Sequence, residues 1–428
     1  MPSHLIQQVR VLDPVSTTDQ IADVLIVDGW IRAIAQQITD IPDETQVWDG
    51  LGKVLGPGLV DLYSHSGEPG FESRETLTSL TQAAIAGGFT RLGILPNTSP
   101  PLDDPAIVAQ FHSYGQLSNA ATTPHPMPRL YPWGALTLAA QGEQMTALGE
   151  LAEAGVVGFA DGKPLQNHLL VRRLLEYVQP LGKPVALWPC DLALARDGVA
   201  REGNYALQLG LPSTPAMAET AALAALLECV AEINTPVHIM RVSTARSVEL
   251  IQQAKANGLP ITASTTWMHL LFSTANLQNY DANLRLEPPL GQPTDQKGLI
   301  AALKTGGLEA IAIDHSPYTY EEKTVAFSQS PPGVIGLELA LPILWRTLVE
   351  LGDWSPLELW RCLSTHPAQC LGQSPPTLQV DHSAELTLFD PQAAWTVEPK
   401  TLKSLSSNTP WLEKQIQGQV LRVWCERR

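Results

Sequence analysis

Short apolar runs alternate with helical stretches through most of the chain. Eight of these runs have the length of buried strands, and amphipathic segments with apolar residues three or four positions apart lie between many of them. Parallel strands that are covered on both faces give such runs, with helices returning the chain from one strand to the next. The pattern predicts a (β/α)8 barrel with strands at Leu55 to Leu62, Thr90 to Leu95, Arg129 to Leu136, Val156 to Ala160, Pro184 to Trp188, Pro236 to Val242, Pro260 to Ala263 and Ala310 to Asp314. Helices are predicted at Arg74 to Ala86, Asn167 to Val178, Pro215 to Ile233, Ala245 to Asn257 and Gln296 to Lys304.

The two chain ends have a different pattern, which is typical of strands. Near the amino terminus, Asp28-Gly29 separates two strand-like runs and predicts a tight hairpin. Beyond residue 380 the chain is strand-like again, from Ala384 to Pro391. We therefore expect an α/β protein in which residues 52–379 form the barrel. Residues 1–51 and 380–428 are expected to pair into one composite β domain beside it.

Composition narrows the class of protein and of partner. The 428 residues are 44% hydrophobic with a mean hydropathy of −0.01, which is enough for a large core. No apolar run reaches the length of a membrane span, and the start of the chain lacks the features of a secretory signal, so we expect a cytoplasmic protein with no membrane partner. A net charge of −16 disfavours binding to nucleic acid. The five cysteines form no Cys-x-x-Cys pair, which disfavours a disulfide framework or a zinc knuckle.

Polar residues follow the first predicted barrel strand at the place where a metal ligand pair is expected. A catalytic zinc is commonly held there by two histidines one residue apart, because strand alternation puts both on one side. This chain has Tyr63 and His65 at those positions. A phenol is a poor zinc ligand because it must first lose a proton with a pKa of about 10. The segment therefore indicates a metal-hydrolase framework with a damaged ligand set.

Ordered motifs along nearly the whole chain resemble the dihydroorotase family of the amidohydrolase superfamily. They are Pro57-Gly-Leu-Val-Asp-Leu, Glu68-Pro-Gly-Phe-Glu, Gly87-Gly-Phe-Thr, Pro96-Asn-Thr-Ser-Pro, Asp161-Gly-Lys-Pro, Val242-Ser-Thr-Ala, Pro288-Pro-Leu, Asp314-His-Ser-Pro, Gly336-Leu-Glu and Leu386-Thr-Leu-Phe-Asp-Pro. The resemblance implies an amidohydrolase-type barrel. It also implies the zinc-dependent, reversible cyclisation of carbamoyl aspartate in pyrimidine synthesis, with metal-bound hydroxide attacking the ring amide during hydrolysis.

The resemblance also implies ligand positions, and half of them are changed. His65, Asp161 and Asp314 match the family pattern, and Asp314 is also the position of the family's proton-transferring aspartate. Tyr63, Trp188 and Arg241 stand where three histidines are expected. An indole N–H cannot ligate a metal, and a guanidinium is a permanent cation. We therefore expect no bound cofactor, and zinc only if the remaining residues still form a site.

The substrate-binding positions that the resemblance implies have changed in parallel. Asn97 survives. Gly67 and Gly291 replace arginines, Glu287 replaces an asparagine, and Tyr318 replaces a histidine. A site that exchanges arginine for glycine and asparagine for glutamate should repel the carboxylates of carbamoyl aspartate.

Each changed residue has a structural interpretation and a functional alternative. We expect Arg241 to pair with Asp161 and Asp314 in place of the metal, the alternative being that it binds an anionic ligand. Trp188 is expected to fill the former metal cavity, the alternative being that it stacks on a ligand. His65, which is unchanged, is expected to be a hydrogen-bonded remnant, the alternative being that it belongs to a surviving mononuclear metal site.

Three further residues, and one set of residues already named, have candidate roles. His238 and His269 are expected in the core or behind the site. Lys163, in the loop beyond the fourth strand, could suggest the carboxylated lysine of other amidohydrolases, although its position disfavours this. Tyr63, Tyr318 and Glu287 together would be a new acid–base set, which no known spacing supports.

These residues predict a pseudoenzyme, and the resemblance implies a partner for it. Inactive dihydroorotase-like chains in bacteria support the assembly of aspartate carbamoyltransferase, so this transferase is the expected partner, and we expect a homo-oligomer. One alternative is an active zinc-dependent cyclic amidohydrolase with a reduced metal site. A second alternative is a small-molecule sensor that uses the emptied pocket.

Overall fold

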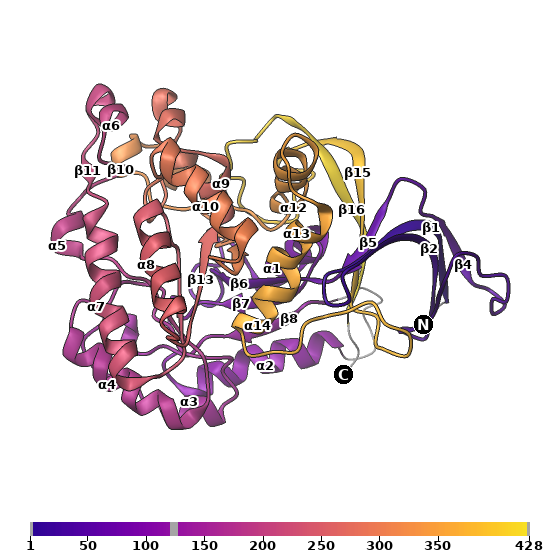
Figure 1. Cartoon of the computed structure of the whole chain (residues 1–428), viewed down its shortest axis with the longest axis horizontal. Coiled ribbons are helices and arrows are strands. Elements are labelled where there is room, and N and C mark those ends of the chain that lie inside the picture. The colour runs from indigo at the N-terminus through magenta and orange to yellow at the C-terminus, as the bar shows by residue number, and fades with distance from the viewer. Residues whose placement is uncertain (1–2, 120–126, 426–428) are drawn as a thin grey trace.

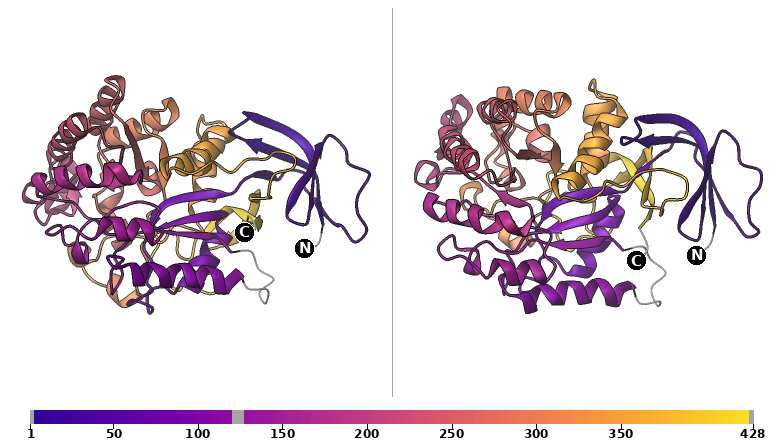
Figure 2. Two further views of the ribbon diagram at one scale, coloured as in Figure 1. Left: turned by 90° about the horizontal axis from the view of Figure 1, so that it is seen from below. Right: turned by 60° about the horizontal axis from the view of Figure 1, so that its bottom comes forward.

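The computed structural model describes residues 3–119 and 127–425, and it consists of a (β/α)8 barrel and a β-sheet that projects from one side of it (Figure 1). The strands of the amino-terminal segment lie away from the helices of the barrel, and Figure 2 shows the same separation from two further directions. No helix in the described ranges is long and apolar enough to span a membrane.

The barrel contains seven regular strands and one short bridging segment. These strands are β6 (Leu59–Ser64), β7 (Phe89–Ile94), β8 (Arg129–Pro132), β9 (Val185–Leu187), β12 (Val237–Ile239), β13 (Ile261–Thr266) and β14 (Ala310–Ala312), and all their pairings are parallel. Phe159 pairs with both Gly134 and Val185, so it takes the place of the fourth strand. Backbone hydrogen bonds from His65 N to His315 O (2.8 Å) and from Asp314 N to Tyr63 O (3.2 Å) close the barrel between β14 and β6. The predicted strand order is confirmed.

The predicted helices are confirmed to within a few residues. They are α1 (Leu77–Ala86), α4 (His168–Val178), α7 (Met217–Ile233), α8 (Ala245–Ala256) and α10 (Pro293–Thr305). Side-chain caps set where several of them begin: Thr76, Asn167 and Thr244 each accept a hydrogen bond from the backbone of the first turn. The remaining helices are α2 (Pro105–Asn119), α3 (Leu148–Glu153), α5 (Leu192–Ala195), α6 (Asn204–Leu209), α9 (Trp267–Leu271), α11 (Tyr320–Lys323), α12 (Ala340–Leu344), α13 (Pro356–Trp360) and α14 (His366–Cys370).

The first predicted strand, Leu55 to Leu62, divides into two strands that belong to different sheets. Val54–Pro57 is β5 of the projecting sheet, and Leu59–Ser64 is β6 of the barrel. The chain passes from one to the other at Gly58, where an added Cβ would lie 2.2 Å from Thr90 Oγ1. A continuous apolar run does not reveal this division, because both strands are buried along their whole length.

The projecting sheet takes strands from both ends of the chain. Its order is β16-β15-β5-β1-β2-β3, with β4 also paired to β1. The strands outside the barrel range are β1 (His4–Asp13), β2 (Thr18–Val27), β3 (Trp30–Ala35), β4 (Gln46–Asp49), β15 (Leu386–Thr396) and β16 (Gln415–Trp424). The hairpin between β2 and β3 is confirmed, and Asp28 and Gly29 both have positive φ (53° and 80°), as a tight turn between antiparallel strands requires. A parallel pair of two-residue strands, β10 (Ala200–Arg201) and β11 (Ser213–Thr214), lies outside both sheets.

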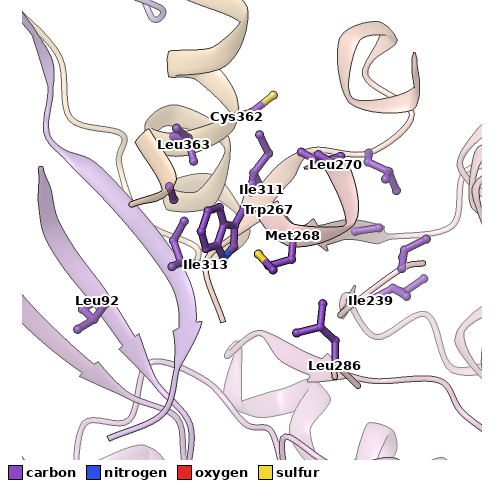
Figure 3. Packing of buried hydrophobic residues seen from close by; sticks show 14 of the residues in the cluster. Leu92, Ile239, Trp267, Met268, Leu270, Leu286, Ile311, Ile313, Cys362 and Leu363 are labelled. Atoms are coloured by element: carbon purple, nitrogen blue, oxygen red, sulfur yellow. The ribbon is translucent and has the colours of Figure 1, made fainter. Parts of the chain in front are cut away.

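The core fills the layer between the barrel strands and the surrounding helices. Figure 3 shows Trp267, at the start of α9, with Ile313 and Met268 on either side of it and Ile311 and Leu363 close by. Trp267 is completely buried, as is Ile311. Complete burial of aromatic and branched side chains supplies the largest favourable term in folding, so the barrel is a packed scaffold that fixes its strand ends.

Candidate functional site at the barrel mouth

The carboxyl ends of the barrel strands bring most of the sequence-predicted site residues together. Tyr63 lies near the end of β6, Trp188 follows β9, and Arg241 and Asp314 lie two residues beyond β12 and β14. Trp188, Arg241 and Asp314 line a pocket of about 300 Å³, whereas Tyr63 is completely buried and does not line it. It is lined by His65, Phe71, Arg74, Asn97, Gly162, Lys163, Trp188, Arg241, Thr266, Met268, His269, Leu286, Glu287, Ile313, Asp314, Ser316, Tyr318, Pro332, Gly333 and Val334.

Arg241 and Asp314 form a two-point ion pair at the centre of this arrangement. Arg241 Nε donates to Asp314 Oδ2 at 2.8 Å, and Nη2 donates to Oδ1 at 2.7 Å. The arginine side chain is only 5% exposed and that of the aspartate 13%. Although burial disfavours the charged guanidinium, the neighbouring Asp314 carboxylate raises the pKa of Arg241 above its ordinary value. The guanidinium therefore stays charged, and the predicted pairing with Asp314 is confirmed.

Asp161 does not join this pair, so that part of the prediction is wrong. Its two carboxylate oxygens accept hydrogen bonds from Thr137 N (3.0 Å) and Thr137 Oγ1 (2.5 Å). Arg241 Nη1 donates instead to the carbonyl oxygen of Gly162 at 3.0 Å. Thr137 satisfies both oxygens of Asp161 without a cation, which leaves Arg241 matched to a single carboxylate.

Tyr63 and His65 both contact the ion pair. Tyr63 is completely buried, shares a hydrogen bond with Ser264 Oγ (3.0 Å) and accepts one from Arg241 N (3.2 Å). Burial raises the pKa of its phenol far above the ordinary value, so the group stays protonated. His65 Nε2 lies 3.4 Å from Arg241 Nη2 and 3.8 Å from Asp314 Oδ1. Burial also lowers the pKa of His65 to about 4, so the ring is neutral at pH 7 and is placed to accept from the guanidinium.

The indole ring of Trp188 packs against the guanidinium of Arg241. The Cζ atom of Arg241 lies 4.9 Å from the centre of the indole ring, and Trp188 is 8% exposed. A cation at this distance from an aromatic face is stabilised by the ring electrons. Trp188 thus helps to bury the charge of Arg241.

The changed substrate positions are also at the mouth. Asn97 donates to the backbone oxygen of Asp161 at 2.8 Å. Glu287 is half-exposed and accepts from Arg285 Nη2 at 3.2 Å. The ring of Tyr318 lies 4.8 Å from Arg74 Cζ, and burial raises the pKa of its phenol. Within the described residues, Tyr63, Tyr318 and Glu287 share no hydrogen bond, so they form no connected acid–base set.

Two glycines replace the arginines of the family pattern. An added Cβ at Gly67 would lie 2.2 Å from Glu75 O and 2.6 Å from Phe71 O, so the loop after β6 has closed on this position. At Gly291 an added Cβ would lie 2.7 Å from Asp295 Cβ and 2.8 Å from Ser243 O. Neither position has room for any side chain on the present backbone.

His238 lies beneath the pocket, His269 forms part of its wall, and Lys163 lies at its edge. His238 is buried between Thr262 Oγ1 (2.9 Å) and Ser264 Oγ (2.8 Å). His269 shares a hydrogen bond with Thr266 Oγ1 at 2.7 Å. Burial lowers the pKa of His238 to about 3 and that of His269 to about 4. Lys163 is exposed at the lip of the pocket.

The residues at the mouth do not fit a zinc ion. The described part of the chain holds no group of three or more His, Cys, Asp or Glu side chains arranged to bind a metal. Arg241 occupies both oxygens of Asp314, Thr137 occupies those of Asp161, and the Tyr63 phenol is fully protonated. Seating a dication beside the guanidinium would also add direct electrostatic repulsion.

Sequence reasoning missed two residues that shape the site. Thr137 follows the third predicted strand directly, so its position at the barrel mouth could have been predicted. Its hydrogen bonds to Asp161 could not. Arg74 lies in the loop before α1 and forms an ion pair with Glu322, with Nε at 3.0 Å from Oε1. The ring of Phe71 also lies 4.6 Å from Arg74 Cζ. Its partner is 248 residues away in the chain, which no local pattern reveals.

Comparisons of the sequence show which known proteins this chain is similar to. Residues 52–244 match the family model described as dihydro-orotase-like. A probable dihydroorotase-like protein of Synechocystis sp. is 45% identical, and the alignment covers 97% of this chain and 98% of that protein. The dihydroorotase of Pelobacter propionicus is 36% identical over 97% of this chain and 96% of its own length.

Solved structures show the same fold at lower sequence identity. The L-hydantoinase (dihydropyrimidinase) of Arthrobacter aurescens aligns with a TM-score of 0.83 over all of this chain and 98% of its own, at 20% identity. The dihydropyrimidinase of Brevibacillus agri aligns with a TM-score of 0.81 at 22% identity, over 99% of this chain and 94% of its own. These likenesses establish the barrel with its attached sheet as the amidohydrolase type of fold.

Proposed function

The chain belongs to the dihydroorotase family, and we propose that it is a non-hydrolytic member of that family. The observation that carries the proposal is the buried two-point ion pair between Arg241 and Asp314. In the family pattern these two positions belong to the metal centre. Here the guanidinium supplies the positive charge that balances Asp314, so the carboxylate is not free to hold a metal or to accept a proton from a substrate.

The substrate half of the site supports the same conclusion. Gly67 has no room for the arginine that would hold a substrate carboxylate, and Glu287 brings a negative charge to the pocket. Arg74 is a cation in the pocket wall, but Glu322 already neutralises it. An entering carboxylate would therefore lose its hydration without gaining an unpaired cation from Arg74 or Arg241.

An activity assay tests this proposal. The purified full-length chain, with zinc added, is given dihydroorotate and, separately, carbamoyl aspartate, beside an active dihydroorotase such as that of Pelobacter propionicus. We expect no turnover above the uncatalysed rate in either direction. Turnover that a chelator abolishes would establish the alternative of a reduced but working metal site.

We further propose that the chain supports the assembly of aspartate carbamoyltransferase. The family resemblance supplies this partner, and the intact core around a dismantled site supports a role for the scaffold rather than for its chemistry. Affinity-tagged full-length chain is recovered from native lysate, and the accompanying proteins are identified by mass spectrometry. We expect the transferase in stoichiometric amount in a high-mass complex. Its absence from the complex, with unchanged transferase size in a strain lacking this chain, would overturn the proposal.

A further inference from the structure

The segment between β15 and β16 reaches from the projecting sheet to the loops of the barrel mouth. Its Ser406 Oγ donates to the backbone oxygen of Arg74 at 2.8 Å, and its Asn408 Oδ1 accepts from Tyr318 N at 3.1 Å. Arg74 and Tyr318 both line the pocket at the mouth. We call residues 403–408 the strap, because they tie two mouth loops to the projecting sheet.

Two buried carboxylates hold the start of the strap by its backbone. Glu338, the last residue of the Gly-Leu-Glu motif, accepts from Lys403 N at 2.8 Å and from Ser404 N at 3.0 Å. Glu75 accepts from Leu405 N at 3.0 Å and from Ser404 Oγ. Glu75 is completely buried, and Glu338 is 8% exposed. Because they bind consecutive residues of the strap, the two carboxylates lie at one site.

Glu75 has enough hydrogen-bond donors to remain charged. Besides its two donors from the strap, it accepts from Ser79 Oγ and from His315 Nε2, which lies at 3.3 Å. His315 Nδ1 accepts from Gly336 N at 3.1 Å, so the ring proton is on Nε2 and points to the carboxylate. Although burial opposes it, the hydrogen bonds from His315 and the strap hold the pKa of Glu75 below its ordinary value.

Glu338 is in the opposite situation. Among the described residues, only the two backbone N–H groups of the strap donate to it, and no side chain does. Burial raises the pKa of Glu338 to about 7, and the charge of Glu75 acts in the same direction. The two N–H donors and the exposed ammonium of Lys403 oppose this shift without cancelling it. Glu338 therefore exchanges its proton in the neutral range.

We propose that the strap is a proton-dependent tether of the barrel mouth, which is held while Glu338 is protonated and is loosened when Glu338 becomes ionised beside Glu75. In the released strap Glu338 meets water and regains the ordinary pKa of 4.5. The folded pKa is the higher one, so the stabilisation is complete below pH 4.5 and is lost as the pH rises to about 7. This tether goes beyond the proposed function and does not depend on the partner or on the absence of hydrolysis.

Hydrogen exchange of the full-length protein tests the tether. Exchange of the strap amides is measured by peptide mass spectrometry between pH 5 and 8 and is corrected for the intrinsic rate at each pH. We expect the protection of the Ser404 and Leu405 amides to fall about tenfold for each pH unit between 5 and 7, and to level off above 7. Peptides from α7 report global unfolding and should not follow this profile.

Three variants assign the proton. Glu338→Gln keeps an oxygen that accepts from the strap and cannot ionise, so its strap protection should not change with pH. Glu75→Gln removes the neighbouring charge, so the loss of protection between pH 5 and 7 should become smaller. Glu321→Gln is the control, because Glu321 is an exposed glutamate of α11, and its profile should match that of the original chain.

Several outcomes would overturn the proposal. Strap protection that stays constant between pH 5 and 8 in the original chain would show that no proton controls the strap. An unchanged pH profile in Glu338→Gln would assign the proton to another group. If Glu338→Gln does not fold, Glu75→Gln decides, because a full loss of protection there would contradict the effect of its charge. A parallel loss of protection in α7 would show global unfolding in place of release of the strap.

Discussion

Arg241 donates two parallel hydrogen bonds to Asp314 across the mouth of the barrel, at 2.8 and 2.7 Å. Both residues have a positive φ, 55° for Arg241 and 51° for Asp314. Residues other than glycine rarely adopt this left-handed backbone conformation. Such backbone strain persists only where the surroundings hold it. The surroundings at the barrel mouth therefore hold these two residues in place, and in the proposed function Arg241 supplies the positive charge that a metal would otherwise bring to Asp314.

Removal of the Arg241 guanidinium should destabilise the fold. Arg241→Met leaves Asp314 as a buried carboxylate without a cation, and we expect the free energy of unfolding to fall by about 3–5 kcal/mol. Urea unfolding at pH 7 measures the change. The exposed Arg246, which pairs with Glu249, provides the control: Arg246→Met should change the stability by less than about 0.5 kcal/mol.

The effects of substituting Arg241 and Asp314 on the free energy of unfolding should be coupled. The double variant Arg241→Met with Asp314→Asn should lose less stability than the sum of its two single variants, because the unpaired charge is gone. Strict additivity would mean that the two residues contribute independently and would count against the ion pair as a unit.

Restoring histidines should restore metal binding. The triple variant Tyr63→His, Trp188→His and Arg241→His adds three ligands around His65 and Asp314 and removes the competing cation. We expect added zinc to raise its melting temperature, since a ligand at 100 times its Kd adds about 2.7 kcal/mol, while the original chain does not respond. Adding Asp314→Ala to the triple variant should reduce the shift; an equal zinc response of the original chain would refute the argument.

Even the smallest side chain at position 67 should destabilise the fold. Gly67→Ala places a methyl group against two backbone oxygens that cannot move freely, so we expect destabilisation of about 1–3 kcal/mol by thermal or urea unfolding. Gly149→Ala is the control, because an added Cβ there meets nothing within 4 Å. If both substitutions are tolerated equally, the loop after β6 is more adaptable than its packing indicates.

Acid should destabilise the protein through its buried histidines. The pKa of His238 is lowered to about 3, against about 6.5 in the unfolded chain, so its neutral form stabilises the fold above pH 6.5. This contribution falls as the pH drops below 6.5 towards 3, by about 1.4 kcal/mol for each pH unit. His238→Gln removes this titration, and its stability relative to the original chain should improve by about 2–3 kcal/mol between pH 7 and 4.5. A constant difference over this range would show that His238 does not titrate as proposed.

The pattern of apolar runs was sufficient for the order of the strands, and the resemblance to the dihydroorotase family supplied the positions of the changed ligands. Apolar runs mark strands that are buried on both faces, and residues just beyond them must meet at one end of a barrel. The pairing of Arg241 with Asp314 followed from charge alone, because a buried carboxylate requires a partner. These inferences depend on local patterns, on the family resemblance that placed Arg241 and Asp314 at one site, and on a general rule of charge compensation.

Contacts that depend on loop conformation could not be predicted in this way. Asp161 was expected to pair with Arg241, but the loop that carries Thr137 supplies its hydrogen-bond donors instead. The division between β5 and β6 at Gly58 is set by close packing against Thr90, which a continuous apolar run does not reveal.

The metal content of the full-length protein, purified without chelators from zinc-supplemented cells, tests the central claim most directly. Elemental mass spectrometry gives the number of zinc ions for each chain, with the histidine-restored triple variant as the positive control. The replacement of the metal by Arg241 predicts a value near zero for the original chain and a higher value for the variant. One or more tightly held zinc ions in each original chain would contradict it.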